Sequence, residues 1–330
     1  MRTAVKRAAL GFLIFLETCV IIFLCVRVTR QVEKQIHSIK YAANLPAAVY
    51  YPQVNSEQFP HFFEPEAARI INDNPTWLGH TVSYSINADN LNERNDYPIP
   101  KPVDGFRIIT LGDSFTYGLF VNTYENYTER LEDYLAGVCP NGRQYEVINL
   151  GVPGYDIGYS AERFRLRGQK YDPDLVVWFI NPFTFEVDAD RRQALEDEYL
   201  SKIPEADHWK VLDGKVEYYP GMLAWQQLAK EANTEQNIEK QVQYFRKFLA
   251  SYHKDLLVVA YNWDFWHPSA VDALQRELMD RDKTWIYKMD PLVPGVTLLP
   301  DAHPNVEGHR RISERIATYM RENDMLMCVR

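Results

Sequence analysis

The segment from Ile108 to Gly118 constrains the fold of this chain more than any other. It reads Ile-Ile-Thr-Leu-Gly-Asp-Ser-Phe-Thr-Tyr-Gly, so an apolar, β-branched run ends abruptly at Gly112-Asp113-Ser114 and a helix-like stretch follows. This pattern is typical of a parallel strand that leads into a helix, with the serine at the carboxyl end of the strand. Ligands of open α/β sheets bind at that edge. Ser114 is therefore a candidate nucleophile if the chain also supplies a base and oxyanion donors.

Strand-like and helix-like segments alternate from Phe106 onwards. The expected strands cover 106–111, 145–150, 175–180, 256–261 and 284–289, and the expected helices cover 123–137, 157–170, 235–251 and the residues from 306. Such alternation predicts a parallel sheet with helices on both faces. His309 falls near the apolar stripe of the last expected helix, so we expect a structural role for it.

Two stretches do not fit the alternation. Residues 41–100 are rich in Pro, Asn and aromatic residues, and we interpret them as an irregular lead-in with a short strand at 81–86. Residues 182–221 are acidic and begin where the third expected strand ends. This stretch is either a lid or substrate-selecting insertion above the active edge, or a solvated surface excursion.

The N-terminus has the pattern of a membrane anchor. Residues 8–26 are apolar apart from Glu17 and Thr18, and basic residues flank them on both sides. As a helix this run would span about 28 Å, close to the thickness of the hydrocarbon core. We expect one transmembrane helix that exports the domain behind it. A cleaved signal peptide is the alternative.

Composition excludes several other classes of protein. The net charge of -9 argues against a nucleic-acid-binding surface. Four cysteines are too few for a disulfide scaffold, and the sequence has no zinc-type Cys or His spacing. We therefore expect neither a metal nor a cofactor. The oligomeric state is left open.

Four polar motifs come at expected strand or loop ends that face one edge of the sheet. They are Gly112-Asp113-Ser114, Asn149-Leu150-Gly151, Asn181, and Asp301-Ala302-His303-Pro304-Asn305. In the expected site His303 is the base that takes the proton of Ser114, and Asp301 orients the imidazole. The oxyanion donors would be the N–H groups of Ser114 and Gly151 and the amide of Asn181. Gly151 is expected to lack a side chain so that the substrate can approach its backbone.

These motifs resemble those of the SGNH hydrolase (GDSL esterase) family, whose blocks carry Ser, Gly, Asn and His in this order. The matching blocks are Gly-Asp-Ser-Phe-Thr-Tyr-Gly, Asn-Leu-Gly-Val-Pro-Gly-Tyr and Asp-Ala-His-Pro-Asn-Val-Glu-Gly-His, and the resemblance covers roughly residues 83–320. It implies a flavodoxin-like three-layer α/β/α sandwich. Two features depart from the family pattern: Pro182 follows Asn181 in place of an acid, and Asp301 precedes His303 by two residues rather than three. A backbone carbonyl is the alternative partner for His303.

The N-terminal apolar run, the irregular lead-in and the resemblance together give the expected domain organisation. Residues 1–30 would be a cytoplasmic tail and transmembrane anchor, 31–100 a juxtamembrane stalk and lead-in, and 101–330 the hydrolase domain with its lid at 182–221. In such a sandwich Cys139 and Cys328 would lie at the same edge, which makes a disulfide between them a hypothesis for an exported domain.

The expected activity is hydrolysis of a carboxylic ester through an acyl-Ser114 intermediate, outside the cytoplasm. The expected substrates are O-acetyl esters of a carbohydrate, with lipid or small acyl esters next. Two alternatives remain open. One is an O-acyltransferase that uses the same residues with a sugar hydroxyl as acceptor, and the other is a catalytically weak glycan-binding subunit of a surface-polysaccharide apparatus.

Overall fold

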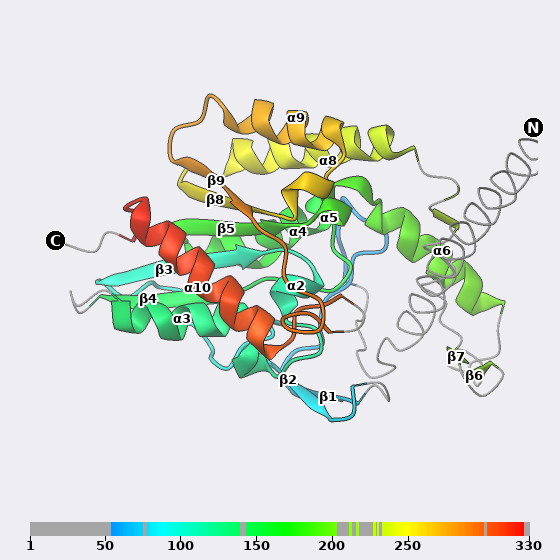
Figure 1. The fold of residues 1–330 in the computed structure, drawn as a ribbon, viewed down its shortest axis with the longest axis horizontal. Coiled ribbons are helices and arrows are strands. Elements are labelled where there is room, and N and C mark those ends of the chain that lie inside the picture. The colour runs from blue at the N-terminus through cyan, green and yellow to red at the C-terminus, as the bar shows by residue number, and fades with distance from the viewer. Residues whose placement is uncertain are drawn as a thin grey trace, which may run out of the picture.

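The core of the protein is a five-stranded parallel sheet. The computed structural model describes residues 54–74, 78–138, 143–202, 211–212, 216–217, 227–228, 230, 233–299 and 302–326. The strands are β3 (Gly105–Leu111), β4 (Gln144–Asn149), β5 (Leu175–Ile180), β8 (Asp255–Tyr261) and β9 (Thr284–Met289). They lie in the order β4-β3-β5-β8-β9, and every neighbouring pair is parallel (Figure 1). The order changes direction between β3 and β5, and such a switch point opens a crevice at the carboxyl ends of the strands.

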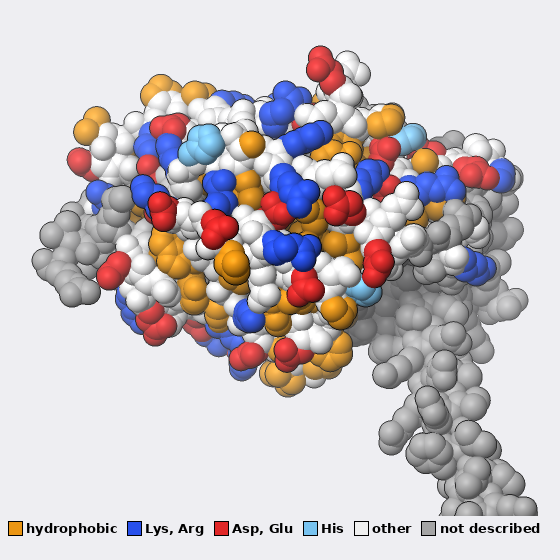
Figure 2. Space-filling view, turned by 90° about the horizontal axis from the view of Figure 1, so that it is seen from above, with side chains coloured by type: hydrophobic (Ala, Val, Ile, Leu, Met, Phe, Trp, Pro, Cys, Tyr) orange, Lys and Arg blue, Asp and Glu red, His pale blue; other side chains and the backbone are white. Residues whose placement is uncertain are grey.

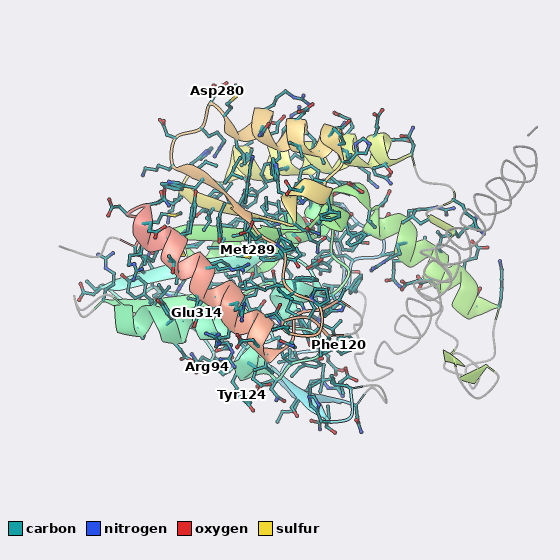
Figure 3. The ribbon with its side chains drawn as sticks, viewed as in Figure 1. Arg94, Phe120, Tyr124, Asp280, Met289 and Glu314 are labelled. Atoms are coloured by element: carbon teal, nitrogen blue, oxygen red, sulfur yellow. The ribbon has the colours of Figure 1, made fainter. Side chains whose placement is uncertain are left out.

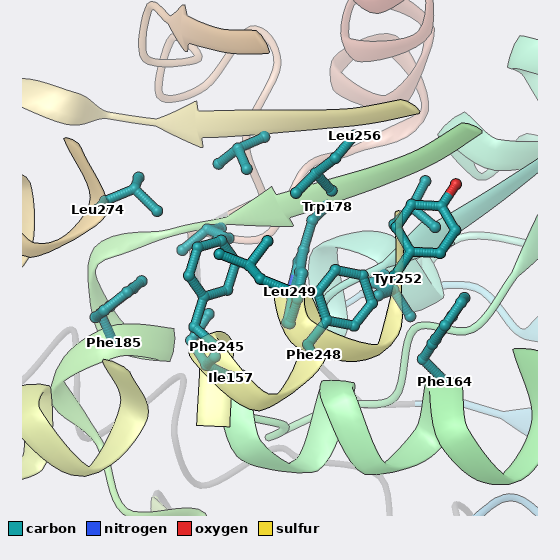
Figure 4. Close-up of a cluster of buried hydrophobic side chains, with 14 of the residues drawn as sticks. Ile157, Phe164, Trp178, Phe185, Phe245, Phe248, Leu249, Tyr252, Leu256 and Leu274 are labelled. Carbon is teal, nitrogen blue, oxygen red and sulfur yellow. The ribbon is translucent and has the colours of Figure 1, made fainter. Parts of the chain in front are cut away.

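Helices cover both faces of the sheet, which confirms the predicted three-layer architecture (Figure 1). On one face α3 (Tyr127–Val138) and α10 (Val306–Glu322) pack against each other and bury a cluster that includes Leu131, Ile312 and Ile316. On the other face lie α4 (Ile157–Arg163), α8 (Thr234–Ser251) and α9 (Pro268–Leu278). Aromatic side chains fill this second core, where the ring of Trp178 packs edge-on against Phe248 at 4.7 Å (Figure 4). The strands read as continuous apolar runs because both faces are buried.

The helices differ from the sequence expectations in three places. The expected helix at 123–137 begins with a 3₁₀ turn at Thr123–Glu125, and α3 itself begins at Tyr127. The expected helix at 157–170 is α-helical only to Arg163 and continues as a π-turn and a 3₁₀ turn to Tyr171. Helix α9 was not predicted. It begins with Pro268 in its first turn after the cap residue His267, a typical start signal that adjacent aromatic residues obscured.

The lead-in packs on the main domain through a hairpin and a buried ion pair. Strands β1 (Arg69–Asp73) and β2 (Val82–Ile86) pair antiparallel, so the strand expected at 81–86 has a partner that the sequence did not reveal. Both side chains of the Glu64–Arg163 ion pair are fully buried. Because removing one partner of such a pair leaves an uncompensated charge, this pair fixes the lead-in on α4.

The insertion after β5 begins as two helices, α5 (Pro182–Glu186) and α6 (Ala189–Ser201). Farther along, β6 (Val211–Leu212) and β7 (Val216–Glu217) form a short antiparallel pair. The first turn of α6 is held on the domain because the carboxylate of Asp156, the N-cap of α4, accepts the N–H of Ala189 at 2.9 Å. The insertion therefore starts from a fixed point beside the β4–α4 loop, and its role as a lid stays a prediction.

Several sequence predictions lie outside the described residues. They are the anchor and stalk up to residue 53, the orienting acid Asp301, and the cysteines Cys139 and Cys328. None of the helices that the structure describes has the length and apolar character of a membrane span. Figure 2 shows the molecule from above, relative to the view of Figure 1. On this face basic and acidic side chains are interspersed, and charges of one sign do not gather in a large patch.

Candidate active site

The nucleophile loop is built by the end of β3 and a single helical turn, α2 (Ser114–Tyr117). Gly112 has to be glycine because a Cβ there would lie 2.2 Å from Thr116 Oγ1. Asp113 caps α2, its carboxylate accepting the N–H of Phe115 at 3.0 Å. The turn ends at Gly118 in the left-handed conformation, with φ of 84°. This tight strand–turn–helix holds Ser114, which is half-buried, at the carboxyl edge of the sheet.

His303 lies against Ser114 from the other end of the sequence. Its Nε2 is 2.8 Å from Ser114 Oγ, a hydrogen-bonding distance across 189 positions of the chain. The loop before α10 fixes the ring: the carbonyl of His303 accepts the N–H of Leu299 at 2.7 Å, and Asn305 caps α10 through the N–H of Gly308. Phe120 packs edge-on against the imidazole at 5.3 Å, near the start of α10 (Figure 3). The predicted nucleophile and base are therefore in contact.

Asn181 joins the nucleophile loop from the end of β5. It caps α5, its Oδ1 accepting the N–H of Thr184 at 3.3 Å, and its Nδ2 donates to Oδ2 of Asp113. Pro182, the departure from the family pattern, occupies the first turn of α5, where no backbone donor is needed. An amide nitrogen carries two N–H donors, so the bond to Asp113 leaves one of them for a ligand.

A buried carboxylate lies beneath this cluster. Burial raises the pKa of Asp113 above its usual range, while the N–H of Phe115, the amide of Asn181 and the charge of His303 act in the opposite direction. His303 is one of the groups that lower this pKa, so Asp113 interacts electrostatically with the imidazole.

Gly151 differs from the sequence expectation. Its N–H donates to Oδ1 of Asn149 at 2.9 Å, so this donor is engaged within its own loop, and its role as an oxyanion donor stays a prediction. The reason for glycine at this position is also different. A Cβ would lie 2.3 Å from the backbone nitrogen of Tyr117, so contact with α2, rather than approach of a substrate, excludes a side chain.

The same loop contains a donor that the sequence reasoning missed. Gly154 is half-exposed and has φ of 81°, and no acceptor for its N–H is found within the described part of the chain. The Asn-Leu-Gly-Val-Pro-Gly motif contains both glycines, so the signal was present in the sequence. Only the hydrogen bond of Gly151 to Asn149 separates their roles.

The described residues contain no group of three His, Cys, Asp or Glu side chains that could hold a metal ion. The described site brings together a hydroxyl, an imidazole, a buried carboxyl group and an amide. This set serves nucleophilic catalysis on an acyl group.

A family model described as the GDSL-like Lipase/Acylhydrolase family matches residues 110–311, which is more than half of the chain and includes all the site residues named above. The chain belongs to this family. As a GDSL-like acylhydrolase it is an enzyme that hydrolyses ester bonds.

Solved structures with similar folds include a putative lipolytic protein of the G-D-S-L family from Desulfitobacterium hafniense DCB-2, at 12% identity over 64% of this chain and 98% of that chain, with a TM-score of 0.38. A family 3 carbohydrate esterase from Clostridium thermocellum is 13% identical over 68% of this chain and 100% of that chain, with a TM-score of 0.40. A two-domain esterase active on acetylated mannans is 14% identical over 66% of this chain and 50% of that chain, with a TM-score of 0.41. A search of curated proteins found no significant match.

Proposed function

We propose that this GDSL-like acylhydrolase is a serine esterase that cleaves carboxylic esters through an acyl-Ser114 intermediate. The observation that carries the proposal is the contact of 2.8 Å between Ser114 Oγ and His303 Nε2. A serine hydroxyl is a weak nucleophile until a base within hydrogen-bonding distance takes its proton. The described residues supply that pair at the carboxyl edge of the sheet, where α/β folds bind their ligands.

In the proposed reaction His303 removes the proton of Ser114 as Oγ attacks the ester carbonyl carbon. Negative charge then develops on the carbonyl oxygen. The donors best placed for it are the N–H of Ser114 at the start of α2 and the second N–H of the Asn181 amide, with the N–H of Gly154 as a third candidate. Collapse of the tetrahedral intermediate transfers the proton from His303 to the leaving alcohol. Water, activated by His303, then hydrolyses the acyl-enzyme.

The proposed substrates are O-acetyl esters of a carbohydrate. An exposed aromatic side chain supports a sugar rather than a fully enclosed acyl chain: Phe265, after β8, is 74% exposed. An exposed ring at the carboxyl edge offers a flat apolar face, and sites for small ligands are typically lined by aromatic residues.

We also propose that the enzyme works outside the cytoplasm, at a membrane. This rests on the apolar run at residues 8–26, whose structure is not described. Protease accessibility of the domain in spheroplasts, compared with lysed spheroplasts, tests it, because both a periplasmic and a cell-surface domain are then exposed. Protection of the domain in intact spheroplasts would contradict the proposal.

The test of the catalytic proposal is active-site labelling by a fluorophosphonate. Wild-type protein is expected to be labelled, and Ser114→Ala and His303→Ala are expected to lose the label. A label that persists in Ser114→Ala would place the nucleophile elsewhere. Assays on acetylated glycans, with and without an added acceptor sugar, then separate hydrolysis from acyl transfer: acetate must be released without the acceptor if the enzyme is a hydrolase.

A further inference from the structure

Helix α6 places an arginine directly on the glycine loop that follows β4. A Cβ at Gly154 would lie 2.1 Å from Nη2 and 2.7 Å from Nη1 of Arg192. The guanidinium therefore lies in contact with the backbone of Gly154. Its side chain is 12% exposed, so it is largely enclosed by the protein rather than part of a solvated surface.

The position of Arg192 is fixed by the docking of α6. Asp156 accepts the N–H of Ala189, and Asp190 accepts the hydroxyl of Tyr159 at 3.1 Å. Lys240 forms an ion pair with Asp188 at 2.7 Å at the start of the helix. These contacts hold the first turn of α6, which also carries Arg192, so its guanidinium is held in place before any ligand binds.

The loop under Arg192 is continuous with the nucleophile loop. The N–H of Val152 donates to the carbonyl of Gly112 at 3.3 Å, and Gly151 packs on the backbone of Tyr117. Gly154 follows two residues after Val152. Arg192 therefore lies on the loop that packs directly against the nucleophile loop carrying Ser114.

The guanidinium has more donors than the described residues use. Its Nε is buried without a hydrogen-bond acceptor in the described part of the chain. Glu196 forms an ion pair with Arg192 in which Oε1 lies 3.6 Å from that Nε, too far for a hydrogen bond. Burial raises the pKa of Glu196, and the charge of Arg192 opposes the shift. An arginine presents five N–H donors in a planar fork that matches a carboxylate. The ion pair leaves these donors unused, and N–H groups that are shielded from water without an acceptor are costly unless a ligand completes them.

We propose that Arg192 binds a carboxylate of the substrate, so that the ester cleaved at Ser114 lies on an acidic, uronate-containing glycan. A carboxylate fits better than a phosphate, because it carries a single negative charge that one guanidinium can balance. The guanidinium of Arg192 also already lies close to the carboxyl group of Glu196. This inference rests on the proposed esterase function and adds to it a substrate class. Arg192 is thus a specificity-determining residue, and Ser114 and His303 carry out the chemistry.

The experiment compares two substrates of matched length and acetylation, acetylated oligogalacturonate and acetylated oligogalactoside, which differ in the carboxylate. Arg192→Gln is expected to lower kcat/KM for the acidic substrate by roughly 10-fold or more, through KM, and to leave the neutral substrate little changed. Arg192→Lys should restore part of the loss, since it returns the charge without the fork. Glu196→Gln should lower KM for the acidic substrate.

Arg191→Gln is the matched control. It removes the same charge from the neighbouring, exposed position of α6, so it is expected to leave both substrates unaffected. Equal losses on both substrates in Arg192→Gln, or the same loss in Arg191→Gln, would overturn the inference. Thermal unfolding of each variant shows that α6 still folds.

Binding separates this inference from the esterase proposal. Calorimetry with Ser114→Ala and the acidic oligosaccharide measures the carboxylate contact without turnover, and adding Arg192→Gln should weaken that binding by roughly 10-fold. If wild-type protein shows no Ser114-dependent hydrolysis of any ester, the proposed esterase function is refuted. The binding data still decide whether Arg192 binds a carboxylate. Equal affinity of Ser114→Ala for the acidic and neutral oligosaccharides would refute the inference alone.

Discussion

His303 and His309 lie six positions apart in the sequence, yet they occupy opposite environments. His303 is half-buried in the loop before α10, with its Nε2 against Ser114 Oγ. His309 is fully buried within α10, where its ring stacks on Tyr127 and its Nδ1 accepts the N–H of Tyr127 at 3.2 Å. One histidine faces the carboxyl edge of the sheet, and the other faces the core.

The difference shows how surroundings decide what an imidazole can do. Burial, followed by the charges of Arg130 and His303, lowers the pKa of His309 to about 3. It therefore stays neutral at physiological pH and serves as a fixed acceptor for the start of α3. A general base must instead take up and return a proton within the working pH range, which requires contact with the reacting group. Only His303 meets that condition.

Removing the imidazole of His303 should have the largest effect on activity. His303→Ala is expected to lower kcat by at least about 10³-fold, because Ser114 loses the group that takes its proton. The unfolding free energy should change little, since the ring is half-buried. Ester hydrolysis and denaturant unfolding measure the two quantities. Near wild-type turnover in His303→Ala would end the assignment of His303 as the base.

Substitution of Asn181 tests whether the carboxyl edge of the sheet, which His303 faces, also stabilises an oxyanion. Asn181→Ser keeps a side-chain cap for α5 but removes the amide donor, so kcat should fall about 10²-fold to 10³-fold. The unfolding free energy should stay close to that of wild type because Ser and Asn are similar caps. A loss of stability with unchanged kcat would instead assign Asn181 a purely structural role.

The sequence predicted those features of the two histidine environments that depend on local sequence pattern. The apolar run before Ser114 and the periodic stripe of α10 gave the strand end, the last helix and the structural role of His309. The sequence could not show that Asn149 accepts the N–H of Gly151, or that Arg192 lies on Gly154. The first is a local side-chain-to-backbone bond that an asparagine can equally leave unmade, and the second depends on how α6 packs on the loop after β4.

His309→Ala should affect stability rather than catalysis. The substitution leaves a cavity and removes the acceptor of the Tyr127 N–H, which together should lower the unfolding free energy by about 2 to 3 kcal/mol. Tyr127 also contacts Thr116 of α2 at 2.9 Å, so the catalytic edge is linked to this site through one side chain. Activity per folded molecule should nevertheless remain, because no reacting group is lost. A loss of activity as large as that of His303→Ala would make the two histidines functionally alike and break the comparison.

The smallest effect is the pH dependence that His309 gives to stability. Its folded pKa is about 3, whereas an exposed histidine of the unfolded chain titrates near 6.5. Above pH about 6.5 both states are neutral and the stabilisation is complete. As the pH falls towards 3, only the unfolded chain binds the proton, so the unfolding free energy drops by about 1.4 kcal/mol per pH unit.

His309→Gln isolates this contribution because its side-chain oxygen can still accept the N–H of Tyr127. Burial raises the pKa of Asp156 to about 6, so this carboxyl acts with the opposite sign and stabilises the folded state as it takes up a proton. The total pH profile is therefore a sum, and the difference between wild type and His309→Gln is the quantity to measure. That difference should slope between pH about 6.5 and pH 3 and be flat above. A flat difference over the whole range would mean that His309 titrates like an exposed histidine, in conflict with its burial against Tyr127.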